Sequence, residues 1–166
     1  MRLNFFLLSI FFSLPTLAQV VSSPNGQVAV KFALTDNGVP TYEMSYKGKP
    51  VVNTSRLGLE LAKDKHASKG LRETSLMDGF VKTDARTSTF DETWKPVWGE
   101  TATIRNHYNE LAVNLSQPSS KRNIIIRFRV YDDGMGLRYE FPQQDSLVYF
   151  TIKEEHTQFA MTGDHT

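Results

Sequence analysis

The chain has 166 residues and a formal charge of +1 at pH 7, with 19 basic and 18 acidic residues. A nearly neutral chain lacks the bulk positive charge that holds nucleic acid or an anionic membrane, so we expect neither partner. The chain contains no cysteine, which excludes disulfides, thiol catalysis and a lipoprotein anchor. Its length is that of one modest domain with its own core.

The first eighteen residues have the layout of a secretory signal peptide. Arg2 supplies a short positive region, an apolar core runs from Phe5 to Leu14, and small residues precede a cut after Ala18. The apolar core is shorter than the roughly 20 residues that span a bilayer, which favours a cleaved signal over a membrane anchor. We therefore expect residues 1–18 to be removed and residues 19–166 to be exported without a membrane anchor. A disulfide-free secreted domain is typical of a bacterial periplasm.

After the signal, apolar and polar residues alternate with the period of a β-strand. In chain order, this pattern predicts strands at 28–34, 42–46, 51–52, 57–61, 111–115, 124–130, 137–141 and 147–152. Turn sequences separate them, among them 36–38, 47–50, 116–123 and 133–134. No segment has a sustained helical period. The sequence predicts an all-β fold, an antiparallel β-sandwich.

Two segments depart from this pattern. Residues 62–79 are rich in Lys, Asp, His, Ser, Gly and Thr, and they predict a long exposed loop. Residues 154–161 resemble the beginning of another strand, and the sequence stops soon afterwards. We therefore expect the sandwich to be incomplete and the chain to be part of a longer protein.

The stretch from Trp94 to Glu110 carries the strongest functional signal. Flat aromatic faces beside carboxylate, amide and guanidinium groups suit a sugar ring, which has apolar faces and a rim of hydroxyls. The candidate residues for binding a substrate or another domain are Trp94, Trp98, Glu100, Arg105, His107, Asn109 and Glu110.

Glu100 and Glu110 bracket this stretch, and folded-back chain between them can bring two carboxylates together. Glycoside hydrolysis needs two such groups about 5–9.5 Å apart. The same residues also have a plain structural interpretation. Glu, Arg and Asn beside a turn often satisfy exposed backbone, and Trp is more often buried than functional. The residues alone assign no catalytic role.

Other chemistries have weaker support. The four histidines show no zinc-ligand spacing. Asp132-Asp133-Gly134 is more typical of a hairpin turn than of a calcium loop. Arg127 and Arg129 alternate with apolar residues, which indicates the solvated face of a strand rather than a nucleic-acid site. We assign no metal ligand from the sequence.

Seven short segments, in the same order along the chain, resemble the N-terminal domain of glycoside hydrolase family 97, which comprises exported α-glucosidases and α-galactosidases. They are Ser23–Gly26, Pro40–Tyr42 with Tyr46–Val51, Ser55–Leu59, Trp94–Glu100, Arg105–Leu111, Arg127–Gly134 and Arg138–Phe141.

The resemblance implies a β-supersandwich like that of galactose mutarotase, followed by a catalytic (β/α)8 barrel and a small β domain. It also implies calcium dependence, with the catalytic carboxylates and most calcium ligands downstream of this chain. We therefore expect the N-terminal β-sandwich portion of an α-glycosidase, which packs on the barrel and lines the sugar pocket. Its substrate would be an oligosaccharide or another α-glycoside, and the chain alone would be inactive.

Two alternatives remain open at this stage. One is a free-standing carbohydrate-binding β-sandwich without catalysis. The other is an immunoglobulin-like adhesion or scaffold domain, for which we expect a complete seven-stranded fold and no response to sugars.

Overall fold

The computed structural model describes residues 18–63 and 75–163. The predicted signal peptide, apart from Ala18, and most of the predicted loop at 62–79 lie outside the described residues. The described residues form eleven strands: β1 (Gln19–Ser22), β2 (Val28–Leu34), β3 (Pro40–Tyr46), β4 (Lys49–Arg56), β5 (Leu59–Leu61), β6 (Ser75–Leu76), β7 (Val81–Trp94), β8 (Ile104–Gln117), β9 (Arg122–Tyr131), β10 (Gly134–Glu140) and β11 (Ile152–Glu155).

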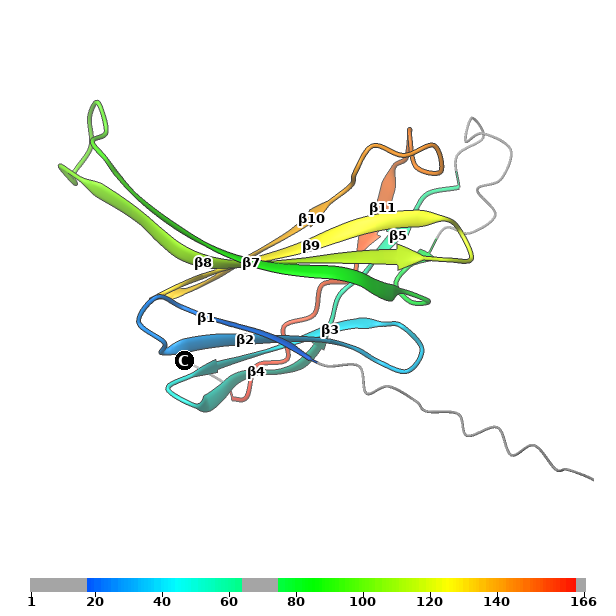
Figure 1. The fold of residues 1–166 in the computed structure, drawn as a ribbon, viewed down its shortest axis with the longest axis horizontal. Helices are drawn as coiled ribbons and strands as arrows, with labels where there is room; N and C mark the ends of the chain where they lie inside the picture. The colour runs from blue at the N-terminus through cyan, green and yellow to red at the C-terminus, as the bar shows by residue number, and fades with distance from the viewer. Residues whose placement is uncertain (1–17, 64–74, 164–166) are drawn as a thin grey trace, which may run out of the picture.

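The strands form two main antiparallel sheets that face each other (Figure 1). The first sheet has the order β1-β2-β3-β4, and the second has the order β10-β9-β8-β7. A third, smaller sheet, β11-β5-β6, lies beside them. This arrangement confirms the predicted all-β antiparallel sandwich.

The core lies between the two main sheets because their strands alternate apolar and polar residues. In β9, Ile124, Ile126, Phe128 and Val130 are buried, while the residues between them are less buried. Phe128 packs with its ring centroid 6.1 Å from that of Phe32 on β2. Burial of these side chains is the main favourable term for joining the two sheets.

The third sheet and the C-terminal segment close one side of the sandwich. The backbone N–H of Gly58 donates a 3.1 Å hydrogen bond to the hydroxyl of Tyr139, which also lies 2.9 Å from Oγ1 of Thr157. Further along, the N–H of Asn53 donates to the carbonyl of Ala160 at 2.8 Å, so the C-terminal segment runs beside β4. Burial raises the pKa of Tyr139.

Most of the strand pattern was predictable. The strands expected at 28–34, 42–46, 51–52, 111–115 and 124–130 all lie within observed strands, 57–61 contains β5, and 137–141 overlaps β10 except for its last residue. Turns also form at Lys47–Gly48, within the expected 47–50, and at Asp132–Asp133, one residue before the expected 133–134, and each joins directly paired strands.

Three expectations about strands and loops were wrong. Residues 147–151 are not a strand, since β11 begins at Ile152. Leu76, placed in an exposed loop by the sequence, is fully buried and belongs to β6. The long strand β7 was not expected, because its residues are polar and mostly exposed and it has no buried face to give a clear alternation.

None of the described residues belongs to a helix long and apolar enough to cross a membrane.

Candidate functional site

The predicted functional stretch forms the distal half of a long β-hairpin. Strands β7 and β8 pair from Val81 opposite Ser116 to Trp94 opposite Ile104, and residues 95–103 connect them. The distal end of this hairpin projects beyond the rest of the sandwich (Figure 1). The candidate residues therefore divide among three places: the tip, the inner side facing the β1 sheet, and the outer side.

The tip of the hairpin is apolar and exposed. Trp98 is 89% exposed and Val97 is 99% exposed, and Glu100 is also exposed. Gly99 has φ +144, a conformation that disfavours other residues. Tryptophan is more often buried in a core than exposed, so Trp98 departs from the usual behaviour of its residue type.

Arg105, His107 and Asn109 lie on the inner side, since alternate residues of a strand share a face. The Arg105 guanidinium donates two hydrogen bonds to the Asp91 carboxylate, at 2.8 and 2.7 Å, and these hold the pKa of Asp91 below its usual value. His107 Nε2 lies 4.0 Å from the same carboxylate.

Asn109 joins the two main sheets. Its Nδ2 donates a 2.8 Å hydrogen bond to the carbonyl of Ser22 on β1, and its Oδ1 accepts one of 2.7 Å from Oγ1 of Thr89 on β7. Both sides of its amide group are therefore engaged in structural contacts.

Glu110 lies on the outer side and is buried, with 8% of its surface exposed. It accepts a hydrogen bond from Nη1 of Arg127 and one of 2.8 Å from Nε of Arg129. Arg127 also donates two 2.8 Å hydrogen bonds to Glu140, whose pKa they lower to about 2. Glu110 therefore belongs to a charge network built from three neighbouring strands.

The hypothesis that Glu100 and Glu110 form a close carboxylate pair is wrong. Glu110 is six residues along β8 from Ile104, or about 20 Å at the rise of an extended strand. Glu100 lies beyond Ile104, in the connection at the far end. Since the hairpin runs outward as an extended ribbon, it separates the two carboxylates.

The structure adds an aromatic cluster that the sequence did not reveal. The ring of Tyr108 stacks on Phe90 at 5.3 Å and packs against Tyr131 at 5.2 Å, and the guanidinium carbon of Arg129 lies 4.6 Å from the centre of the Tyr108 ring. These residues come from β7, β8 and β9, so only the strand register shows that they meet. The cluster connects the Glu110 network to the outer side of the hairpin.

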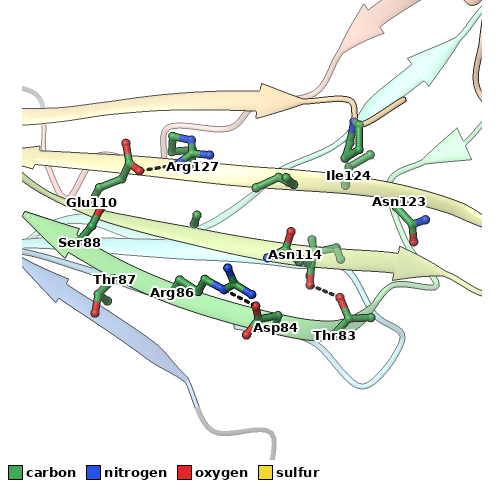
Figure 2. Close-up of a pocket in the computed structure, with 14 residues that line it drawn as sticks. Thr83, Asp84, Arg86, Thr87, Ser88, Glu110, Asn114, Asn123, Ile124 and Arg127 are labelled. Carbon is green, nitrogen blue, oxygen red and sulfur yellow. Dashed lines mark hydrogen bonds and ion pairs between the residues drawn. The ribbon is translucent and has the colours of Figure 1, made fainter. Parts of the chain in front are cut away.

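A shallow groove of about 640 Å³ follows the outer face of the β10-β9-β8-β7 sheet (Figure 2). Glu110 and Arg127 lie at one end, and Asp84, Arg86 and Asn114 line it further along. Its walls offer hydrogen-bond donors and acceptors, but the residues 95–100 of the hairpin tip do not line it. The groove and the exposed tryptophan are therefore separate features of the surface.

One group of side chains has the spacing of metal ligands. One ligand atom from each of Glu60, Glu154 and His156 lies within 4.8 Å of the others. Calcium prefers six to eight oxygen ligands, and here an imidazole replaces one of them while Lys153 already donates a 2.7 Å hydrogen bond to Glu60. These residues do not fit a calcium site.

Comparison with known proteins assigns the chain to a family. Residues 21–166 match the family model described as glycosyl-hydrolase 97 N-terminal. Two solved structures of a glycoside hydrolase family 97 enzyme from Pseudoalteromonas sp. strain K8, one with panose and one with acarbose, are each 31% identical over 89% of this chain, with a TM-score of 0.77. A β-arabinopyranosidase, 23% identical over 85% of the chain, shares the fold with a TM-score of 0.72.

The chain covers 21% of the length of each of these three structures. The match extends over nearly all of the described residues, and it includes the seven segments that carry the resemblance in the sequence. The chain belongs to the glycoside hydrolase family 97 N-terminal domain family.

Proposed function

We propose that this chain is the exported N-terminal β-sandwich portion of an α-glycosidase that hydrolyses α-glucosides or α-galactosides. It packs on a downstream catalytic (β/α)8 barrel, and the β7–β8 hairpin contributes to the edge of the sugar pocket. The observation that carries this proposal is the exposed, apolar hairpin tip, which reaches beyond the sandwich with Trp98 89% exposed.

Because the tip is exposed and apolar, covering it with another surface lowers the free energy of the protein. Transfer of an indole and a valine side chain out of water is favourable by about 2 kcal/mol each, so the tip gains stability when another surface covers it. Tryptophan is also enriched at interfaces and on sugar-binding surfaces, because one flat face can cover a large apolar area. Glu100 lies beside it and can accept hydrogen bonds from hydroxyl groups.

The similar enzymes support the sugar assignment. The Pseudoalteromonas enzyme binds panose in one structure and acarbose in another. Because this chain spans about a fifth of that enzyme, catalysis would come from polypeptide outside residues 1–166. Calcium in the intact enzyme would likewise be held mainly outside this chain, since Glu60, Glu154 and His156 do not fit it.

Hydrolysis assays on the full-length protein test this function. We expect release of the free sugar from an aryl α-glucoside or α-galactoside, and loss of that activity after treatment with a calcium chelator. Activity on neither substrate would contradict the proposal. Accumulation of the protein in the periplasm, with Gln19 as its first residue, would test export.

A free-standing carbohydrate-binding sandwich is the second candidate. The exposed Trp94 and Trp98 lie entirely within this chain, and they favour it. If it is correct, maltooligosaccharides should quench the tryptophan fluorescence of residues 19–166, and the full-length protein should have no hydrolytic activity. Hydrolysis by the full-length protein would favour the glycosidase over the free-standing carbohydrate-binding module.

A further inference from the structure

Strand β7 is an open edge of the β10-β9-β8-β7 sheet. Among residues 18–63 and 75–163, β8 is the only strand that pairs with it, although it is fourteen residues long. In an antiparallel pair, about half of the N–H and C=O groups of an edge strand point away from the partner. Many backbone donors and acceptors of β7 therefore face outward.

The opposite sheet does not cover this edge. Its own edge strand, β1, lies under β8, as the hydrogen bond from Asn109 to Ser22 shows. From Thr87 to Trp94 the side chains of β7 are exposed on both faces. The second sheet thus extends one strand beyond the first on this side of the sandwich.

A groove of about 340 Å³ runs between the two open edges. Val20 and Ser22 of β1 line one side, and Thr87 and Thr89 of β7 line the other. The third sheet closes the opposite side of the sandwich, whereas no strand among the described residues closes this side. Small and β-branched side chains around the groove leave room for the side chains of an added strand.

The middle of β7 lacks the usual protection of an edge strand. Natural edges carry bulges, charges or proline that prevent pairing with other chains. The first part of β7 has such features, a bulge between Lys82 and Asp84 and the charge of Arg86. The four residues Thr87–Phe90 are uncharged and continuously paired with β8, and they contain no proline or glycine.

We propose that an extended segment of the same protein, from outside residues 1–166, adds to β7 as a further strand alongside Thr87–Phe90. The segment pairs with the outward backbone groups and covers the groove between β1 and β7. The occupant is the same polypeptide because this chain spans only 21% of the length of the enzymes it matches over 89% of its own length. The proposal rests on the proposed function only in requiring that longer protein.

Residue-resolved hydrogen exchange on the full-length protein tests this pairing. If a strand is added, the amides of Thr87–Phe90 should all exchange about 100-fold or more slowly than unprotected amides. Asn109–Leu115 of β8, which is paired with β7 on one side and β9 on the other, is the internal control. Alternation of fast and slow amides along Thr87–Phe90 would overturn the proposal.

Crosslinking identifies the occupant. Ser88 is replaced by a photoreactive benzoylphenylalanine in the full-length protein, and the linked peptides are identified by mass spectrometry. A link within one molecule to a peptide outside residues 1–166 is the expected result. A link to a second copy, or no link, would overturn it. Neither measurement depends on sugar hydrolysis, so a failure here is distinguishable from a failure of the proposed function.

Discussion

Trp94 and Ile104 lie directly opposite each other at the last paired position of the β7–β8 hairpin, and both side chains are substantially exposed. They share the outer side of the hairpin with the stacked rings of Phe90 and Tyr108. An apolar strip thus leads from the sheet toward the exposed tip at Trp98. A strip of this kind in a soluble domain indicates a surface that is covered in the intact protein.

The turn between β2 and β3 provides a sharp test of the fold. Gly38 has φ +71, and a Cβ atom at this position would lie 2.4 Å from the backbone N and O of Phe80. Gly38→Ala should lower the free energy of unfolding by about 3 kcal/mol or more, because neither backbone can move aside. Chemical denaturation measures the loss.

Gly26→Ala is the matched control. Gly26 has nearly the same φ, +73, but nothing lies within 4 Å of an added Cβ. This variant should lose only about 1 kcal/mol, the cost of the left-handed conformation. Equal losses for both variants would contradict the close approach of Gly38 to Phe80.

The charge network predicts a pH dependence. Glu140 has its pKa lowered from 4.5 to about 2, first by its hydrogen bonds with Arg127. Its contribution to stability is therefore fully present above about pH 4.5 and is lost as the pH falls toward 2. Glu140→Gln should reduce the free energy of unfolding by on the order of 1 kcal/mol at neutral pH.

The difference between the parent protein and Glu140→Gln should shrink steadily as the pH is lowered below about 4.5. Urea unfolding midpoints, measured for both proteins from neutral to acidic pH, give this difference. Glu92→Gln, a change at an exposed position of β7, is the control and should have little effect at any pH. A difference that stays constant on acidification would refute the role of the Glu140 carboxylate.

The closed side of the sandwich depends on Tyr139. Tyr139→Phe removes the hydroxyl that accepts a hydrogen bond from the Gly58 N–H and contacts Thr157. We expect a loss of about 1–2 kcal/mol, because a partly buried N–H is left without this acceptor. Tyr46→Phe, at an exposed position, should be nearly neutral in the same thermal or chemical unfolding assay. Similar effects of the two changes would contradict the account of this contact.

The sequence predicted those parts of the fold in which burial determines the residue pattern. Strand β9 alternates strictly because one face packs on the core, and its position was predicted closely. Strand β7 was not predicted because both of its faces are largely exposed. Apolar and polar residues therefore do not alternate regularly along it.

The sequence was sufficient to locate the candidate site, but it could not show how the side chains of the site are placed relative to one another. The density of aromatic and polar residues between Trp94 and Glu110 identified the hairpin. The positions of their side chains depend on strand register, which places Glu110 among arginines of β9 and leaves Trp98 at the tip. Long-range groups such as Glu60 with His156 depend on pairing between distant segments, which no local pattern reveals.

The central claim, that the hairpin tip takes part in sugar hydrolysis, is tested most directly by the kinetics of Trp98→Ala in the full-length protein. Tyr149→Ala is the matched control, since Tyr149 is 83% exposed but belongs to the connection between β10 and β11 rather than to the hairpin. With an α-glucoside substrate, and at a temperature where both variants remain folded, Trp98→Ala should lower kcat/KM about tenfold, a loss of about 1.4 kcal/mol in transition-state stabilisation. Unchanged kinetics with unchanged stability for Trp98→Ala would contradict the account.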